Sequence, residues 1–132
     1  MQYEPGLSRD QLIELATRTY FGSVDAKNMD ATLACFTDEA LFCVQTSFTR
    51  HAGKAEIRRM FEDFFGGYAK IVHKDFTCTV DEAHGRIAAS FEAVLTGHDG
   101  QVTHLSNTNF WRVRDGRFQE VYVYMSGTNV LV

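Results

Sequence analysis

The sequence predicts an α+β domain in which helices precede a mainly antiparallel sheet. Apolar residues recur at helical spacing in three segments of the first half of the chain. The second half contains four runs of strand length that are rich in β-branched and aromatic residues. Short polar connections join these four runs, which is typical of consecutive antiparallel strands. We therefore expect a curved sheet with helices covering one side.

The first two helices are predicted from capping signals and apolar spacing. Ser8 and Gln11 form a capping-box pattern before a helix over residues 9–22. Asn28 is the expected N-cap of a second helix, which carries its apolar face through Phe36 and ends before the polar pair at 38 and 39.

A short strand pair and a third helix are expected next. The apolar run 40–44 predicts a strand, and residues 48–51 are expected to pair with it as a hairpin arm. From Lys54 onward the apolar residues follow one helical stripe, and Gly66 and Gly67 predict its end.

Residues 71–80, 86–96, 101–114 and 118–125 are predicted to form the rest of the sheet. Asp115-Gly116 indicates a tight hairpin between the last two strands, since glycine accepts the positive φ of such a turn. In the third of these strands the odd-numbered residues from Leu105 to Val113 make an apolar face that is interrupted only by Asn107 and Asn109. On the opposite face, aromatic residues gather with one threonine, and we expect this outer face to form a homodimer interface through Thr108, Phe110, Tyr122 and Tyr124.

Length and composition restrict the class of protein. A chain of 132 residues with 45% apolar residues is expected to form one domain over 1–132. A net charge of −4 argues against nucleic acid as a partner, and no apolar run approaches the length of a membrane span. No secretory signal is visible at the start, so a cytoplasmic location is expected. The three cysteines have no CxxC spacing and are expected to be reduced, and the histidines show no metal-ligand spacing, so no metal is expected.

The order of elements and three stretches of sequence resemble the SnoaL-like division of the nuclear transport factor 2 superfamily. The stretches are VDAKNMDATLACFTDEALF, GKAEIRRMFEDFF and NFWRVRDGRFQEVYVYMSG. The resemblance covers nearly the whole chain and implies a cone-shaped half-barrel, in which the curved sheet surrounds a pocket closed by the helices. Members of this superfamily include ketosteroid isomerases, scytalone and bile acid dehydratases, polyketide cyclases, oxygenase small subunits and non-catalytic binding domains.

The resemblance also implies candidate catalytic residues. Val44 occupies the position of the isomerase general base, whereas Tyr20 and Asn109 occupy the positions of its two hydrogen-bond donors. Tyr20, Asp25 and His73 match the Tyr, Asp and His pattern of bile acid dehydratases. Scytalone dehydratase has a second pocket histidine where this chain has Phe91.

This pattern implies proton transfer by His73, which Asp25 orients, with Tyr20 and Asn109 donating to a developing oxyanion. Tyr20 and Asp25 are five residues apart, about 140° off a common helical face, so the first helix is expected to end between them. A first helix that runs unbroken through Ala26 would argue against the arrangement of Tyr20, Asp25 and His73. Each candidate also has a structural alternative. Tyr20 could be a core tyrosine, Asp25 a helix-capping carboxylate and His73 a core histidine. Asn109 could be a strand asparagine that hydrogen bonds to neighbouring backbone. The pocket wall is expected to comprise Phe42, Phe61, Phe64, Phe91, Leu95, Trp111, Val121, Val123 and Met125.

Two functions remain open at this point. The first is a lyase or isomerase without a cofactor that acts on a small, largely apolar carbonyl compound bound in the cone. The second is a domain of the same fold without turnover, either a ligand-binding protein or a small subunit of an oxygenase. Convergent polar groups around an open cavity favour the enzyme, and a filled or purely apolar cone favours the binding domain.

Overall fold

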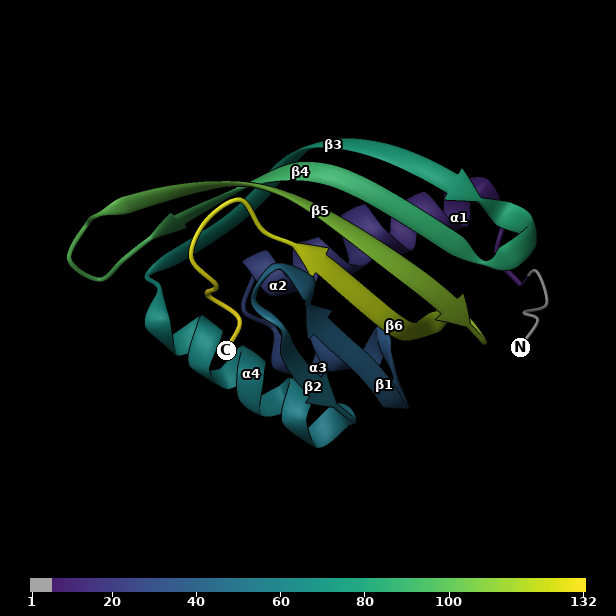
Figure 1. The fold of residues 1–132 in the computed structure, drawn as a ribbon, viewed down its shortest axis with the longest axis horizontal. Coiled ribbons are helices and arrows are strands. Elements are labelled where there is room, and N and C mark those ends of the chain that lie inside the picture. Colours follow the sequence, from purple (N-terminus) through teal and green to yellow (C-terminus); the bar gives the residue numbers. More distant parts are fainter. Residues whose placement is uncertain (1–5) are drawn as a thin grey trace.

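The computed structural model describes residues 6–132 and has the predicted α+β architecture. Figure 1 shows a strongly curved sheet with the helices gathered on its concave side. The helical elements are α1 (Arg9–Ile13), η1 (Glu14–Tyr20), α2 (Phe21–Asp25), α3 (Met29–Ala34), η2 (Gln45–Ser47), α4 (Lys54–Gly67) and η3 (Glu82–His84). The strands are β1 (Phe36–Val44), β2 (Thr49–Ala52), β3 (Lys70–Asp81), β4 (Arg86–Thr96), β5 (Val102–Arg114) and β6 (Arg117–Tyr124).

The six strands form one mixed sheet in the order β2-β1-β6-β5-β4-β3. All neighbouring pairs are antiparallel except β1 and β6, which run parallel. The register of β3 against β4 shifts between Lys74 and Thr77, where Asp75 has a φ of 59°. Such a bulge bends the strand, and the long strands β3 and β4 curve over the helices (Figure 1). The mainly antiparallel, cone-like sheet predicted from the sequence is confirmed.

The first helix begins as predicted but ends later. Ser8 and Gln11 form both hydrogen bonds of a capping box. The helix then continues through a π-helical stretch, η1, and through α2 as far as Asp25, so the expected end at residue 22 is wrong. The helix stops in a Schellman motif, in which the N–H groups of Lys27 and Asn28 donate to the carbonyls of Val24 and Ser23. Lys27 takes the positive φ of 53° that usually marks a glycine, so the sequence carried no stop signal.

The second helix is shorter than predicted. Asn28 caps it as expected, because its side chain accepts a hydrogen bond from the N–H of Ala31. The helix ends at Ala34, and Phe36 begins β1 instead of extending the helical face. Phe36 is fully buried and pairs with Phe118 of β6. Pairing with a strand about 80 residues away therefore overrides the local helical spacing.

The remaining elements follow the prediction closely. α4 buries the apolar stripe expected of it, through Ile57, Met60, Phe61, Phe64 and Phe65. Asp115 and Gly116 both have positive φ, 53° and 76°, and close a two-residue hairpin between Arg114 and Arg117. The odd-numbered side chains of β5 from Leu105 to Val113 are buried, as the alternation predicted. Within the described residues, no helix is both long enough and apolar enough to cross a bilayer.

Candidate active site

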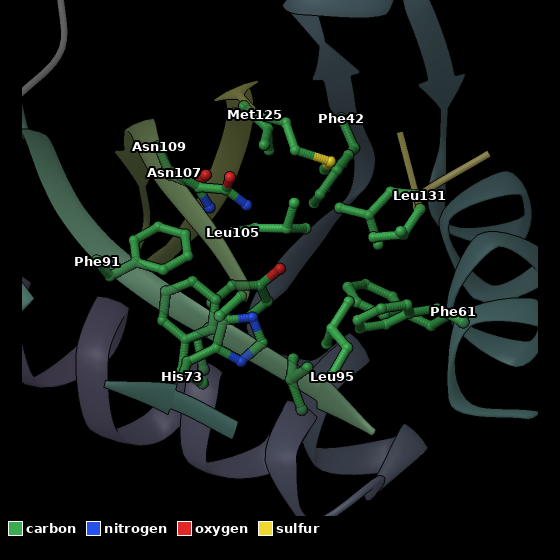
Figure 2. Close-up of a pocket in the computed structure, with 17 residues that line it drawn as sticks. Phe42, Phe61, His73, Phe91, Leu95, Leu105, Asn107, Asn109, Met125 and Leu131 are labelled. Carbon is green, nitrogen blue, oxygen red and sulfur yellow. The ribbon is translucent and has the colours of Figure 1, made fainter. Parts of the chain in front are cut away.

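The concave side of the sheet and the helices enclose a small cavity of about 30 Å³. Figure 2 shows its lining residues, which number 17. They are Tyr20, Phe21, Val24, Phe42, Phe61, Phe64, His73, Phe91, Ala93, Leu95, Leu105, Asn107, Asn109, Val123, Met125, Val130 and Leu131. Most of this wall is apolar, and the polar lining residues are one tyrosine, one histidine and two asparagines.

Asp25 and His73 form a hydrogen-bonded pair at the edge of this cavity. The Nδ1 of His73 donates to Oδ1 of Asp25 at 2.6 Å, and the backbone N–H of His73 donates to Oδ2 at 2.8 Å. β3 is an edge strand, so this N–H has no neighbouring strand on its free side and Asp25 satisfies it. Because Nδ1 carries the proton in this arrangement, Nε2 is left with its lone pair.

The predicted relation between Tyr20 and Asp25 is correct in one respect and wrong in another. The helix does not end between them, contrary to the expectation. The two residues nevertheless face different ways, as the rotation along a helix requires: Tyr20 lines the cavity, whereas Asp25 is absent from the lining and reaches β3. The pair forms because Asp25 only has to face His73, not the cavity.

Aromatic rings fix the orientation of the imidazole. The ring of Phe21 stacks on His73 with the centroids 4.2 Å apart, and Phe91 packs against it at 5.6 Å. The His73 side chain is 8% exposed. With one face covered and Nδ1 tied to Asp25, the ring has little freedom to rotate, and it points into the cavity (Figure 2).

Tyr20 lies deeper and is enclosed by aromatic rings. Edge-on contacts with Phe36, Phe118 and Trp111 hold its ring at centroid distances of 5.3 to 6.2 Å. Burial, with smaller contributions from Cys35 and Asp25, raises the pKa of Tyr20 well above 10.0. Among the described residues nothing hydrogen bonds to its hydroxyl. The phenol is therefore a protonated donor with unused capacity.

Asn109 and Asn107 bring two carboxamides to the same cavity from β5 (Figure 2). Asn109 is 3% exposed, and its Oδ1 is buried without a hydrogen-bond partner among the described residues. Asn107 is 7% exposed, and its Oδ1 accepts a hydrogen bond from the backbone N–H of Ser126 at 3.2 Å. Asn107 was not among the predicted catalytic residues. Like Asn109 it is an odd-numbered residue of β5, so the alternation along the strand could have identified it as facing the cavity.

Seven of the nine expected wall residues line the cavity: Phe42, Phe61, Phe64, Phe91, Leu95, Val123 and Met125. Trp111 and Val121 do not. Trp111 stacks on Phe118 in the core, and Val121 is fully buried. The ring of Trp111 contacts the ring of Tyr20, which itself lines the cavity.

A segment that sequence reasoning did not assign also reaches the cavity. Residues 126–132, here called the strap, follow β6 and turn back toward α4 (Figure 1), bringing Val130 and Leu131 into the lining. The Nε2–H of His51 donates to the carbonyl of Leu131 at 3.0 Å, and Asn129 donates to Thr49 at 3.0 Å. The strap has no regular secondary structure and no apolar period, so no sequence pattern identified it.

The outer face of the sheet carries exposed aromatic residues at the predicted positions. Phe110 is 47% exposed and Tyr124 is 44% exposed, and their rings meet edge to face at 5.7 Å. Tyr122 lies beside them, and burial followed by its hydrogen bond to Glu120 raises its pKa to about 12. The described residues contain no group of three or more His, Cys, Asp or Glu side chains placed to hold a metal ion.

Comparison with known proteins gives the following matches. Residues 17–121 match the family described as the SnoaL-like domain. No curated protein matches the chain. Among solved structures, a candidate polyketide cyclase from Xanthomonas campestris pv. campestris is 21% identical, with a TM-score of 0.78 over 88% of this chain and 90% of that one. A candidate isomerase from Bacillus subtilis is 19% identical, with a TM-score of 0.78 over 89% and 87%. SalBIII, an epoxide hydrolase/cyclase-like enzyme of pyran ring formation in salinomycin, is 15% identical, with a TM-score of 0.79 over 90% and 93%.

Proposed function

This chain belongs to the SnoaL-like domain family, and from that premise we propose that it is an acid–base enzyme of the isomerase, lyase or cyclase type acting on a small apolar carbonyl compound. The single observation that supports this most strongly is the Asp25–His73 pair at the wall of the cavity. The descriptions of the similar structures as cyclases and an isomerase support the same reaction class.

The proposed base is Nε2 of His73. A carboxylate on Nδ1 fixes the tautomer in which Nε2 can accept a proton, and it stabilises the imidazolium that then forms. A histidine is also the side chain whose pKa suits proton transfer near neutral pH. Val44, at the position of the isomerase base, is buried and cannot accept a proton, so His73 takes this role in the proposal.

The reaction begins with the α C–H bond of the bound carbonyl compound. Nε2 of His73 takes the proton, the C–H electron pair forms a C=C bond, and the carbonyl π pair moves to oxygen as an enolate. Tyr20 and Asn109 are the proposed donors to that oxygen, in a mostly apolar site where hydrogen bonds are stronger than in bulk water. Where the compound has a β,γ double bond, the electron pair extends over that bond as a dienolate, and Nε2–H of His73 returns the proton at the γ carbon, which isomerises the compound. Alternatively, the enolate expels a β-hydroxyl that takes the proton from Nε2 and leaves as water.

This sequence of steps requires no metal or organic cofactor, since the proton moves between carbon, nitrogen and oxygen and no electrons are gained or lost overall. The cavity lining carries no Lys or Arg among the described residues, so a neutral compound is the proposed ligand. A volume of about 30 Å³ holds only one or two water molecules, so a substrate requires lining side chains to move. We propose that Val130 and Leu131 move, because they belong to a strap without regular secondary structure.

The outer aromatic face supports a further part of the proposal, a homodimer. Phe110 and Tyr124 leave apolar surface exposed on a sheet whose other face is covered. A second copy of the chain is the proposed partner at this face.

Exchange of α-protons tests the proposed chemistry without knowledge of the natural substrate. Acetophenone is incubated with the protein in heavy water, and loss of its methyl signal is followed by proton NMR. Wild-type protein is expected to speed this exchange, and His73→Ala is expected to slow it by at least about 10²-fold. His84→Ala is the matched control, because His84 also pairs with an aspartate, Asp81, but lies outside the cavity. Exchange that is absent in the wild type, or equal in His73→Ala, would contradict the role of His73.

One observation favours a second function, ligand binding without turnover. The cone is nearly filled by its own side chains, as expected of a binding domain that accepts a ligand only after rearrangement. Under this alternative acetophenone binds, yet its methyl protons exchange no faster than in buffer.

A further inference from the structure

We infer that Asn107 is a substrate-binding residue whose amide N–H donates to the carbonyl oxygen, and that the backbone N–H of Ser126 sets its orientation. This inference rests on the proposed function and adds to it a donor on the same wall as Asn109.

The orientation of the Asn107 side chain follows from its hydrogen bond to the backbone N–H of Ser126, here called the tie. An asparagine side chain has an oxygen that only accepts and a nitrogen that only donates, and its two ends are told apart by their partners. The backbone N–H of Ser126 is a fixed donor, 3.2 Å from the side-chain atom of Asn107 that faces it, so that atom must be Oδ1. The Nδ2 group is therefore turned the other way.

That Nδ2 group has no hydrogen-bond partner among the described residues. Asn107 lines the cavity and is 7% exposed, so its unused donor lies in a mostly apolar space. A donor that faces a mostly apolar cavity without a partner is satisfied by a bound ligand that supplies an acceptor. Asn109, with a buried Oδ1 that also lacks a partner, is two residues along the same strand face. The free Nδ2 group of Asn107 therefore points to a ligand acceptor such as a carbonyl oxygen, whereas the Oδ1 of Asn109 could accept from a donor on the same ligand.

The tie also explains why the donor is held still. Ser126 is doubly anchored, since its hydroxyl accepts from the N–H of Ser106 at 2.9 Å. Its neighbour Met125 donates its own N–H to Thr46 at 3.2 Å. A donor held by such anchors needs little reorganisation when charge develops on the substrate oxygen. The ligand class is therefore a neutral aldehyde or ketone, because an anion would find no cation in the lining among the described residues.

Asn107→Asp separates this role from a merely structural one. The new carboxylate can still accept from Ser126, so the tie survives, but it presents an oxygen instead of an N–H to the cavity. Asn107→Leu removes both the tie and the donor. Asn28→Asp is the matched control, because aspartate caps a helix as well as asparagine does, and Asn28 lies outside the cavity.

The probes are acetophenone, its isostere 2-phenylpropene, which lacks the oxygen, and benzoate. Binding is measured by NMR titration, and the carbonyl stretching frequency of bound acetophenone reports hydrogen bonding. We expect the wild type and Asn28→Asp to prefer acetophenone over 2-phenylpropene by about tenfold and to bind benzoate more weakly. We expect Asn107→Asp to lose that preference at neutral pH and to recover it in acid, where the protonated carboxyl becomes a donor. Asn107→Leu should lack the preference at every pH.

A wild type that binds no acetophenone, or an Asn107→Asp variant that keeps the full preference at neutral pH, would overturn the inference. The α-proton exchange of the same samples keeps the two proposals apart. Binding that depends on Asn107 without exchange that depends on His73 overturns the proposed function alone. Exchange that depends on His73 but is equally fast in Asn107→Asp overturns the role of Asn107 alone.

Discussion

Replacing Asp25 with asparagine changes the tautomer of His73 while keeping the shape of the pair. In the wild type, the carboxylate accepts from both the backbone N–H and Nδ1 of His73. The backbone N–H is a fixed donor, so the single oxygen of the new amide must accept from it. The amide N–H then faces Nδ1, which can only remain in contact by accepting. The imidazole proton moves to Nε2, and the lone pair that faced the cavity is lost.

The size of the effect follows from these two contacts. One charge-assisted hydrogen bond of about 1.5–3 kcal/mol is replaced by a neutral one of about 1 kcal/mol, so stability should fall by about 1–2 kcal/mol. For a domain of this size that is a fall in Tm of roughly 3–10 °C. Loss of the base should slow α-proton exchange of acetophenone by about 10²–10⁴-fold.

Three measurements check this prediction. Calorimetry gives the change in Tm, proton NMR gives the exchange rate, and heteronuclear NMR of the imidazole nitrogens identifies the tautomer. Asp81→Asn is the matched control, because Asp81 forms the same contact with His84 at 2.8 Å on the surface. Exposed pairs of this kind are worth little, so the control should change stability by less than about 0.5 kcal/mol and exchange not at all. An Asp25→Asn variant that keeps the Nδ1–H tautomer, or that exchanges as fast as the wild type after the tautomer has changed, would refute the role assigned to Asp25.

Three further predictions concern other parts of the molecule. Leu131→Ala should enlarge the cavity beneath the strap, which raises the affinity for acetophenone and lowers the free energy of unfolding by about 1–2 kcal/mol. An unchanged affinity in an NMR titration would show that the strap does not block the cavity. Because burial raises the pKa of Tyr20, the stability it contributes is complete below pH 10.0 and declines as the pH rises above this value. Alkaline unfolding of Tyr20→Phe should therefore show a shallower fall of stability above pH 10.0 than the wild type, and parallel curves would contradict the assignment. Phe110→Glu should convert the proposed dimer to a monomer in analytical ultracentrifugation, whereas a wild type that sediments as a monomer would remove the proposal.

The elements predicted well from sequence were those fixed by local chemistry. The capping box at Ser8, the cap at Asn28 and the Asp115-Gly116 turn each depend on residues within a few positions of one another. The alternation along β5 also predicted its buried face, including both asparagines. The pairing of Asp25 with His73 was reachable through resemblance to a family, but their distance of 48 positions is bridged only by the fold.

Tertiary structure decided the features that depend on contacts between distant segments. Pairing with β6 made Phe36 a strand residue, and a Schellman motif at Lys27 let the first helix run to Asp25. The strap is held at the cavity by a hydrogen bond from His51, a contact between segments about 80 residues apart. Local propensity is worth only tenths of a kcal/mol per residue, so burial against a distant partner overrides it where the two disagree. For the same reason the sequence predicted which residues face inward, whereas the volume left between them was decided only by how the side chains and the strap pack.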